Sequence, residues 1–256
     1  MLKGMVSLVT GGASGLGKAT VERLASNGGR VVILDMQATR AQEVAKKFGN
    51  DVSVSVGSVT SEEDVNKALD IAVQKYGRLD TLVNCAGFNQ TYQIYNFKKD
   101  KACTMEDFEK CIQVNTIGTF NTIRLAVGLI GKNQPTEDGQ RGVIVNTAAT
   151  TAYDGDIGQA AIAASNAAIV GMTLPIARDL AKQGIRVVTI APGTFDTPLL
   201  SYLPEKMIEF IKRMTPFPSR LGKPAEFAHL VTSIIENPML NGETIRLDGA
   251  QRWFPL

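Results

Sequence analysis

The sequence predicts an α/β fold: a single doubly wound Rossmann domain with a mainly parallel seven-stranded sheet and helices on both faces. Three observations support this. Short apolar runs alternate with longer helical patterns along all 256 residues, a glycine-rich turn follows the first run, and no linker, internal repeat or low-complexity tract interrupts the alternation. Strands that alternate with helices of this length form βαβ units and therefore a parallel sheet.

The expected elements follow from hydrophobic spacing and flanking turn residues. Strands are expected at residues 5–9, 31–34, 52–56, 79–84, 143–147, 186–190 and 243–247. Helices are expected at residues 15–27, 38–48, 61–76, 105–130, 160–183 and 225–236. Ser61 is the expected N-cap of the third helix because three acidic residues follow it in the first turn.

The elements predict one domain over residues 1–256 with two unusually long connections. Residues 88–104 form an insertion with several lysines, and residues 194–223 hold four of the ten prolines. Long connections in compact domains are usually functional or mobile, so the second is expected to form a substrate loop.

Composition excludes several classes of protein. The chain is 44% hydrophobic and 20% charged, and its net charge of +2 gives no broad basic field, so direct nucleic-acid binding is not expected. No apolar run of membrane-spanning length is expected, and the first residues show neither a secretory signal nor a long Arg-rich leader. These features predict an intracellular protein without a membrane span.

Cysteine and histidine usage indicates no metal site. Cys85, Cys103 and Cys111 are odd in number and lack metal-ligand spacing, so they are interpreted as reduced thiols. His229 is the only histidine and lies in a helical pattern, where a structural role is expected.

The turn at residues 10–17 predicts dinucleotide binding. Its spacing is G-x-x-x-G-x-G, and it lies between the first strand and the first helix. Glycines there let the backbone approach a pyrophosphate, while the helix N-terminus offers free N–H groups and a positive dipole end. The expected cofactor contacts in this turn are Gly11, Ser14, Gly15, Leu16 and Gly17.

Two further segments also favour dinucleotide binding. Asp35 ends the second strand, where a carboxylate accepts hydrogen bonds from a ribose 2′-hydroxyl and repels a 2′-phosphate, which favours NAD(H) over NADP(H). A turn or capping aspartate is the alternative, and Arg40 is interpreted as a helix-surface charge. Asn84, Cys85, Ala86 and Gly87 end the fourth strand, where small residues let a cofactor pass; alone they could form an ordinary turn.

Together these motifs resemble the short-chain dehydrogenase/reductase family across essentially the whole chain. The matching residues are 10–17, Asp35, 84–87, Asn115, Pro192 and Gly193. Segments 95–99, 146–148, 158–161, 169–180, 217–221 and 235–250 look like the type II 3-hydroxyacyl-CoA dehydrogenases of that family, also called 17β-hydroxysteroid dehydrogenase type 10. The resemblance adds Ser58, Val59, Pro192, Gly193 and Phe195 to the expected cofactor contacts.

The resemblance implies a homotetramer, mitochondrial in many relatives, that oxidises 3-hydroxyacyl-CoA or hydroxysteroid substrates with NAD. It also implies a possible protein partner, because relatives serve without catalysis as a scaffold for a tRNA methyltransferase. A mitochondrial location is thus expected by resemblance, with the cytoplasm left open.

The catalytic set of the family is absent. In the family a Ser, a Tyr thirteen positions later and a Lys four positions after that bind the substrate oxygen, exchange its proton and hold the nicotinamide ribose. The corresponding residues here are Ala149, Ile162 and Asn166, and only the family's Asn is retained, as Asn115. Since a positioned acid–base group contributes about 10²–10⁴-fold in rate, hydride transfer is expected to be impaired.

Neighbouring hydroxyl groups are the candidates to take over the roles of the missing serine and tyrosine. Thr150 and Thr151 could place a hydroxyl near the missing serine, whereas Tyr153 has no lysine four positions later. Tyr95 and Lys99 show Tyr-x-x-x-Lys spacing within the insertion, which is interpreted as fortuitous.

Cofactor affinity is expected to be weakened. The resemblance implies an Asp that contacts the adenine amino group, and this chain has Ser58 at that position. A lost charge-assisted hydrogen bond costs about 1.5–3 kcal/mol. Two hypotheses follow: an NAD(H)-binding scaffold with little or no activity, or an active NAD-dependent 3-hydroxyacyl-CoA or hydroxysteroid dehydrogenase with a rearranged proton relay.

Overall fold

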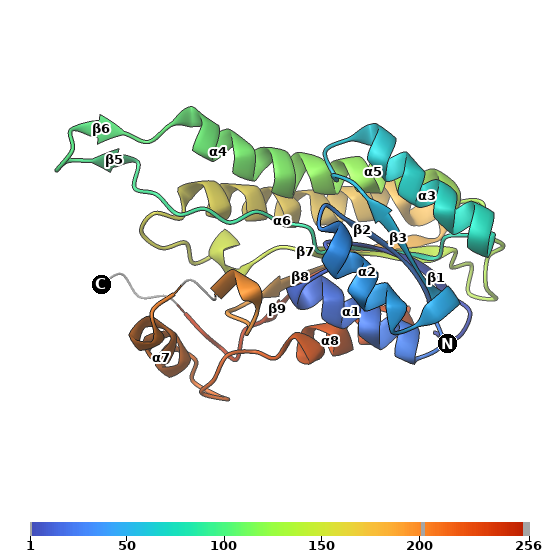
Figure 1. Ribbon diagram of the computed structural model, residues 1–256. Coiled ribbons are helices and arrows are strands. Elements are labelled where there is room, and N and C mark those ends of the chain that lie inside the picture. Colours follow the sequence, from blue (N-terminus) through green and yellow to red (C-terminus); the bar gives the residue numbers. More distant parts are fainter. Residues whose placement is uncertain (1, 201–202, 253–256) are drawn as a thin grey trace.

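The computed structural model describes residues 2–200 and 203–252, which contain one large parallel sheet. Its strand order is β3-β2-β1-β4-β7-β8-β9 (Figure 1). The strands are β1 (Val6–Thr10), β2 (Arg30–Asp35), β3 (Val52–Val56), β4 (Thr81–Asn84), β7 (Gly142–Thr147), β8 (Ile185–Pro192) and β9 (Thr244–Leu247). All paired neighbours are parallel, which confirms the predicted doubly wound fold.

Helices cover both faces of the sheet (Figure 1). One face packs against α1 (Gly15–Ser26), α2 (Ala38–Lys46) and α8 (Pro224–Glu236). The other packs against α3 (Glu62–Tyr76), α5 (Thr119–Ile130) and α6 (Ala160–Leu180). Two-sided coverage explains the continuous apolar runs in the strands, because successive side chains point to opposite buried faces.

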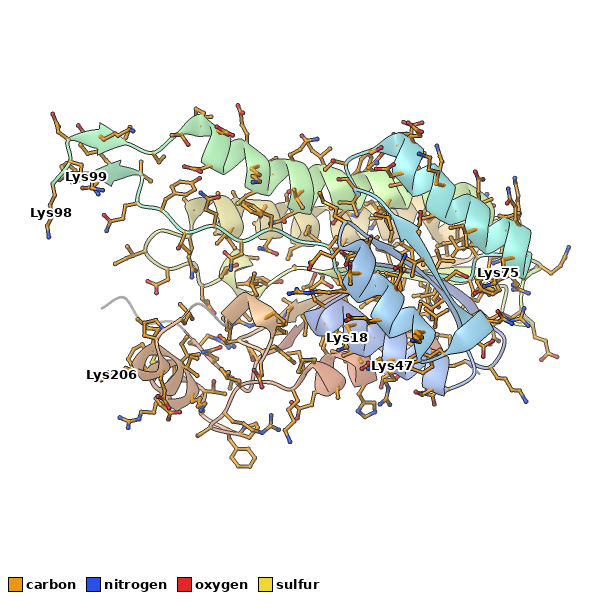
Figure 2. The ribbon with its side chains drawn as sticks, viewed as in Figure 1. Lys18, Lys47, Lys75, Lys98, Lys99 and Lys206 are labelled. Atoms are coloured by element: carbon orange, nitrogen blue, oxygen red, sulfur yellow. The ribbon has the colours of Figure 1, made fainter. Side chains whose placement is uncertain are left out.

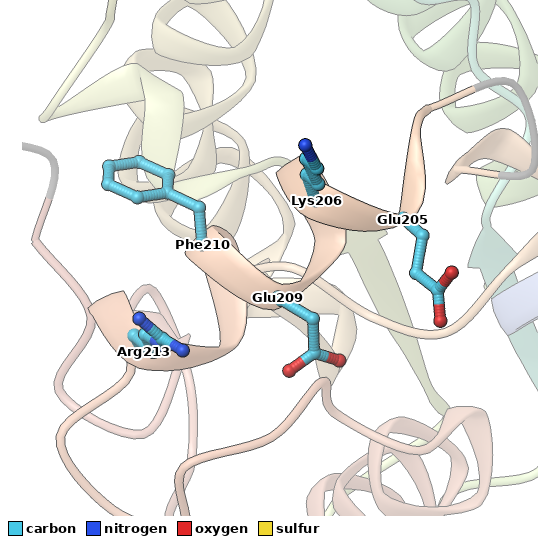
Figure 3. A pocket seen from close by; sticks show the side chains of 5 residues that line it. All are labelled: Glu205, Lys206, Glu209, Phe210 and Arg213. Atoms are coloured by element: carbon cyan, nitrogen blue, oxygen red, sulfur yellow. The ribbon is translucent and has the colours of Figure 1, made fainter.

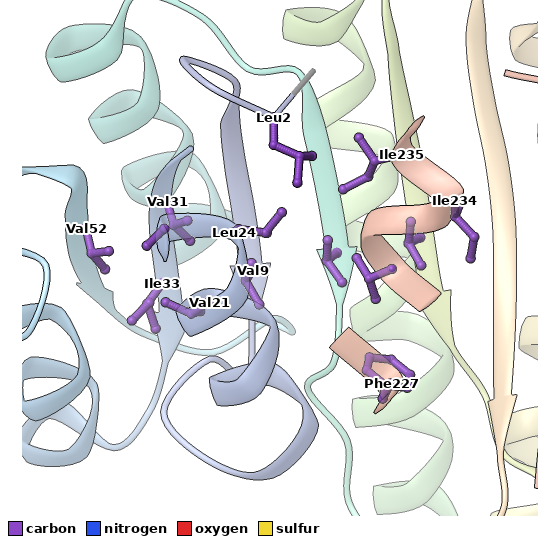
Figure 4. Close-up of a cluster of buried hydrophobic side chains, with 14 of the residues drawn as sticks. Leu2, Val9, Val21, Leu24, Val31, Ile33, Val52, Phe227, Ile234 and Ile235 are labelled. Atoms are coloured by element: carbon purple, nitrogen blue, oxygen red, sulfur yellow. The ribbon is translucent and has the colours of Figure 1, made fainter. Parts of the chain in front are cut away.

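The two cores show this alternation within β1. Val9 belongs to the cluster that contains Val21 of α1 and Phe227 of α8 (Figure 4). Leu8, its neighbour along the strand, belongs to the cluster formed with α3, α5 and α6. A one-residue shift of β1 would exchange these faces, so the apolar pattern fixes the register.

The strand order reverses between β1 and β4. The chain runs from β1 through β2 to β3, and β4 then pairs with the opposite side of β1. Ligands of open α/β sheets bind outside the carboxyl ends of the strands at such a switch point. The predicted nucleotide residues therefore meet at one edge of the sheet.

The long helix expected at 105–130 has a different internal structure. It consists of α4 (Met105–Cys111), a π-helical segment (Ile112–Gly118) and α5. The apolar spacing predicts one regular helix, because a single π-helical segment shifts the helical periodicity only slightly. Asn115 lies within this segment.

The two long connections contain regular structure that the sequence pattern missed. Residues 88–104 include an antiparallel pair, β5 (Tyr95–Asn96) and β6 (Lys101–Ala102). Residues 194–223, of which 201–202 lie outside the described residues, include α7 (Glu205–Met214). Two-residue strands are too short for a periodic signal.

One expectation about apolar length was wrong. Among the described residues, Ala160–Gln183, which comprises α6 and the turn after it, is long and apolar enough to cross a membrane by length and composition. However, α6 packs against β8, and its buried Ile169 and Ala177 belong to the apolar clusters. We interpret α6 as a core helix, whose high apolar content comes from packing on two sides.

Candidate functional site

The glycine-rich turn after β1 brings the backbone into close contact with β4. Gly11 has φ +66°, and a Cβ there would lie 2.8 Å from the Ala86 nitrogen. A Cβ on Gly17 would collide with the Gly11 carbonyl oxygen. Thr10 Oγ1 accepts hydrogen bonds from the backbone nitrogens of Cys85 and Ala86, each at 3.1 Å. These contacts place residues 84–87 directly beside the turn.

The N-terminus of α1 fits an anion. Gly15 begins the helix with φ +52°, and within the described chain Ser14 makes no side-chain capping hydrogen bond. The first turn of α1 contains no acidic residue. The first N–H groups of a helix lack intrahelical acceptors, so this end retains donors and a positive dipole for a pyrophosphate.

Asp35 braces the same turn. Its side chain is 9% exposed; Oδ2 accepts from the Ala13 nitrogen at 3.0 Å, and Oδ1 accepts from the Gln37 nitrogen at 2.9 Å. A carboxylate oxygen has two acceptor positions, so each can still accept from a ribose hydroxyl. The structure thus adds a loop-bracing role to the predicted ribose contact.

The loop after β3 is held by internal hydrogen bonds. Ser58 Oγ lies 2.8 Å from Thr60 Oγ1 and also accepts from the Thr60 nitrogen at 3.2 Å. Asp64 accepts from the Ser58 nitrogen at 3.0 Å, and Asn121 Nδ2 donates to the Val59 carbonyl at 2.8 Å. The Ser58 hydroxyl is therefore already engaged within its own loop.

The end of β4 contributes mainly backbone to the edge. Asn84 Nδ2 donates to Asn146 Oδ1 at 2.9 Å, and Asn84 Oδ1 accepts from Thr122 Oγ1 at 2.8 Å. Its amide thus points into the core, so a cofactor contact there would fall to its backbone. Burial raises the pKa of the Cys85 thiol to about 11, which keeps it protonated at neutral pH.

The positions expected to carry catalysis form a neutral, internally bonded cluster. Asn115 is 6% exposed; its Oδ1 accepts from the Phe88 nitrogen at 2.7 Å, and its Nδ2 donates to Phe88 O at 2.9 Å and Ser165 Oγ at 3.0 Å. Ser165 Oγ and Asn166 Nδ2 both donate to the Ile162 carbonyl, at 3.0 and 2.8 Å. The Asn166 amide nitrogen is thus turned back onto its own helix.

Ile162, the position at which the family resemblance implies a tyrosine, lies in an apolar cluster. Its side chain is 6% exposed and groups with buried Cys111 and Ala161. Phe88, Tyr92 and Phe108 pack against the same cluster. Ala149 begins the short turn after β7 in extended backbone and has no polar side-chain atom. Neither residue can exchange a proton or donate a side-chain hydrogen bond.

The hydroxyl groups that could replace the catalytic ones lie in two different parts of the molecule. Thr150 is buried after Ala149, and Thr151 Oγ1 is buried without a hydrogen-bond partner among the described residues. Tyr95 donates instead to Asp100 Oδ1 at 2.6 Å within the β5–β6 hairpin. Lys98 and Lys99 lie at the end of this hairpin, which projects from the body of the molecule (Figure 2).

The loop after β8 uses its backbone donors internally. The Gly193 nitrogen donates to the Leu247 carbonyl at 3.0 Å, and the Thr194 nitrogen donates to Gln251 Oε1 at 3.3 Å. Phe195 is 7% exposed and packs edge-on against Phe227 of α8, with ring centroids 6.5 Å apart. Its ring thus stabilises the core, and Pro192 ends β8 beside it.

Two other features lie apart from this edge. A hollow of about 400 Å³ on α7 is lined by Glu205, Lys206, Glu209, Phe210 and Arg213, and its two acidic and two basic side chains balance in charge (Figure 3). Among the described residues, no group of three or more His, Cys, Asp or Glu side chains could hold a metal ion, and His229 is exposed on α8.

Sequence reasoning missed Ser165 as a site-organising residue, and it included Thr10 in the turn without its role as a bridge to β4. Ser165 joins the Asn115 amide to the Ile162 carbonyl, and Thr10 joins β1 to the end of β4. The position of Ser165, one residue before Asn166 on an apolar helix, was the available signal because a polar residue there needs a buried partner.

Comparison with known proteins agrees with this geometry. A short chain dehydrogenase family model matches residues 5–208. The chain is 58% identical to 3-hydroxyacyl-CoA dehydrogenase type-2 of Drosophila melanogaster over 100% of both chains. It is 57% identical to the Homo sapiens protein of that name, over 99% of this chain and 97% of the human one.

Solved structures show the same similarity. 3-Hydroxyacyl-CoA dehydrogenase type-2 from Mycobacterium avium has a TM-score of 0.94 at 41% identity, covering 99% of this chain and 98% of its own. The 3-ketoacyl-(acyl-carrier-protein) reductase from Brucella melitensis, complexed with NADH, has a TM-score of 0.86 at 30% identity, covering 98% and 99%.

The fold and the glycine-rich edge define a nucleotide-binding α/β protein. The chain belongs to the short-chain dehydrogenase family, in the lineage of proteins named 3-hydroxyacyl-CoA dehydrogenase type-2. The resemblance predicted from its motifs is therefore confirmed.

Proposed function

We propose that this protein binds NAD(H) at the carboxyl edge of its sheet and transfers hydride poorly or not at all. Binding is supported by the close-packed turn of Gly11 and Gly17, the open N-terminus of α1 and the buried Asp35. A structural neighbour that contains NADH has the same fold.

One observation carries the second half of the proposal. The side chains at Ala149, Ile162 and Asn166 contain no group that exchanges a proton at neutral pH, and the Asn115 amide is already hydrogen-bonded to Phe88 and Ser165. Oxidation of an alcohol requires removal of its hydroxyl proton along with the hydride. Without a positioned base, the reaction loses about 10²–10⁴-fold in rate, and residues that act as a unit lose more together than separately.

We also propose a weakened affinity for NAD(H). The Ser58 hydroxyl is engaged with Thr60, and Asn166 carries no charge toward a ribose. Assembly as a homotetramer, a mitochondrial location and a scaffold role toward a partner such as a tRNA methyltransferase complete the proposal. Their support is the family resemblance.

A second candidate function is an active dehydrogenase with a rearranged proton relay. The relatives at 57–58% identity are named as dehydrogenases, and this naming favours the active candidate over the inactive one. Thr150 and Thr151 are the hydroxyl groups nearest in sequence to the missing serine. Their position after β7 would have to deliver a hydroxyl to the substrate oxygen.

Binding and turnover measured on the same sample separate the two candidates. We expect calorimetric titration to detect NAD⁺ and NADH binding, and an absorbance assay with acetoacetyl-CoA and NADH to give no turnover above background. Turnover within about tenfold of the rate of the human relative would establish the active candidate, whereas absence of binding to folded protein would refute nucleotide binding itself.

A further inference from the structure

The two halves of the nucleotide site differ in what they offer a ligand. From the strand order, a dinucleotide whose pyrophosphate lies at the α1 N-terminus places its adenosine half toward β2 and β3. Its nicotinamide half then lies toward β4, β7 and β8. Ala149 follows β7, and Ile162 and Asn166 lie in α6, the helix that connects β7 to β8.

The adenosine and pyrophosphate half retains its glycine-rich turn, its helix N-terminus and Asp35, although the Ser58 hydroxyl there is engaged with Thr60. Gly11 and Gly17 leave room for close backbone approach, and within the described chain the N-terminus of α1 has no side-chain cap. Asp35 stands at the end of β2 with acceptor capacity on both oxygens. These groups bind an ADP moiety whatever is attached to its terminal phosphate.

Several polar groups of the nicotinamide half are already hydrogen-bonded to the protein itself, although the buried Thr151 hydroxyl has no partner among the described residues. Asn166 Nδ2 donates to Ile162 O, and both ends of the Asn115 amide are bonded to protein. On the opposite side, the backbone nitrogens of Gly193 and Thr194 donate to Leu247 O and Gln251 Oε1. A ribose or carboxamide that contacts these donors would compete with the hydrogen bonds they already make.

This half also lacks a charge at the position nearest the second ribose. The family resemblance places a lysine where this chain has Asn166, and a neutral amide neither attracts ribose hydroxyls strongly nor distinguishes a cationic from a neutral nicotinamide ring. Ile162 presents only hydrocarbon beside it.

We propose that the site recognises the ADP portion of its ligand and gains little from the nicotinamide portion, so that ADP-ribose and ADP bind about as well as NAD⁺ and NADH. This inference rests on the proposed nucleotide binding and specifies its ligand class as ADP-bearing nucleotides. A protein with this site would respond to such nucleotides without sensing their redox state.

Titration calorimetry of the full chain with NAD⁺, NADH, ADP-ribose and ADP at one ionic strength tests the proposal. We expect the four dissociation constants to agree within about fivefold, which corresponds to about 1 kcal/mol. A larger preference for either form of NAD over ADP-ribose or ADP would overturn the inference while leaving nucleotide binding intact. Failure of all four ligands to bind folded protein would overturn both.

Two variants probe the halves separately. Asp35→Asn should weaken all four ligands by a similar factor, because it alters the half that they share. Asn166→Lys should strengthen NADH and ADP-ribose relative to ADP by about fivefold or more, since only they carry a second ribose for the ammonium group. Equal effects of Asn166→Lys on all ligands would contradict the proposed division. Thermal melting verifies that each variant is folded, and the wild-type series is decisive without them.

Discussion

At the scale of single residues, the site is defined by where side chains cannot be accommodated. Gly17 lies so close to the Gly11 carbonyl that no side chain fits there, whereas Gly128 in α5 has open space around it. A glycine is therefore required at position 17 by the close backbone contact, whereas no steric contact requires one at position 128.

Gly17→Ala is expected to destabilise the protein by about 1–3 kcal/mol, because the added methyl group forces the turn apart. NAD⁺ binding should fall with it. Urea denaturation and calorimetry measure the two effects. The matched control, Gly128→Ala, should leave binding unchanged and raise stability by up to about 1 kcal/mol through helix propensity. Similar losses in both variants would contradict the steric account.

Cys85 is expected to be unreactive in the native state. Burial raises the pKa of its thiol to about 11, so the thiolate is about a thousandth of the population at pH 8. Alkylation by iodoacetamide, followed by peptide mass spectrometry, should label Cys85 slowly at pH 8 and quickly in urea. Rapid native labelling would show that this part of the β4 end is open to solvent.

At the scale of elements, buried charges join helices to the sheet. Arg186 of β8 is 6% exposed and donates from its guanidinium to the carbonyls of Ile234 and Ile235 in the last turn of α8 and to that of Leu240, which follows the helix. Burial lowers the pKa of Arg186 to about 10, which still leaves it charged at neutral pH. A positive charge at a helix C-terminus is favoured by the helix dipole.

Arg186→Met should therefore destabilise the protein by about 3 kcal/mol, since carbonyl groups at the end of α8 lose charge-assisted hydrogen bonds. Arg186→Lys is the control, because it keeps the charge but reaches fewer carbonyls, and an intermediate loss is expected. Guanidinium chloride denaturation of the three proteins provides the comparison. A loss below about 1 kcal/mol in the methionine variant would mean that water replaces the guanidinium.

The stability of the α8 N-terminus depends on pH through the carboxyl group of Glu226. Hydrogen bonds from Arg220 and from the Lys223 backbone nitrogen lower the pKa of Glu226 from 4.5 to about 2. Since the folded-state pKa lies below the unfolded one, the contribution of Glu226 is complete above the unfolded pKa. It is lost as pH falls toward the folded value.

Glu226→Gln should consequently be less stable than wild type at pH 7, and the difference should narrow as pH falls from 5 toward 3. The effect will be modest because the pair is partly exposed. Thermal melting at several pH values measures it, with Glu236→Gln at the other end of α8 as a control. A difference that stays constant with pH would refute the electrostatic origin.

The amino-acid sequence predicts elements with repeated spacing better than those without. The strands and most helices follow from apolar runs such as those in β1 and β8. In contrast, the β5–β6 hairpin, the π-helical segment around Asn115 and the helix α7 were missed. The reason is physical: a two-residue strand has no period, and a π turn depends on local hydrogen bonding rather than on the hydrophobic pattern.

The same limit applies to the site. Gly11 and Asp35 follow from motif spacing, and the same spacing predicts that Ala149, Ile162 and Asn166 occupy the positions of the family's catalytic set. Their bonding partners could not be predicted, because Ser165 meets Asn115, and Phe88 meets it from another loop, only after folding. It is these partners that show the Asn115 amide to be hydrogen-bonded within the protein.

At the scale of the whole molecule, an intact dehydrogenase fold carries a nucleotide edge beside a neutral catalytic position. The fold depends on two buried cores and a parallel sheet, neither of which requires an acid–base group. Loss of catalysis would therefore leave the fold and the ADP-binding half unaffected. Restoring the three side chains should then suffice to restore chemistry.

The most direct test of this account is NADH-dependent reduction of acetoacetyl-CoA by the wild type and by the triple variant Ala149→Ser, Ile162→Tyr, Asn166→Lys. The human relative of 57% identity serves as the active reference. We predict no turnover by the wild type and a gain of at least about 10²-fold in the triple variant. A wild-type rate within about tenfold of the reference would contradict the account.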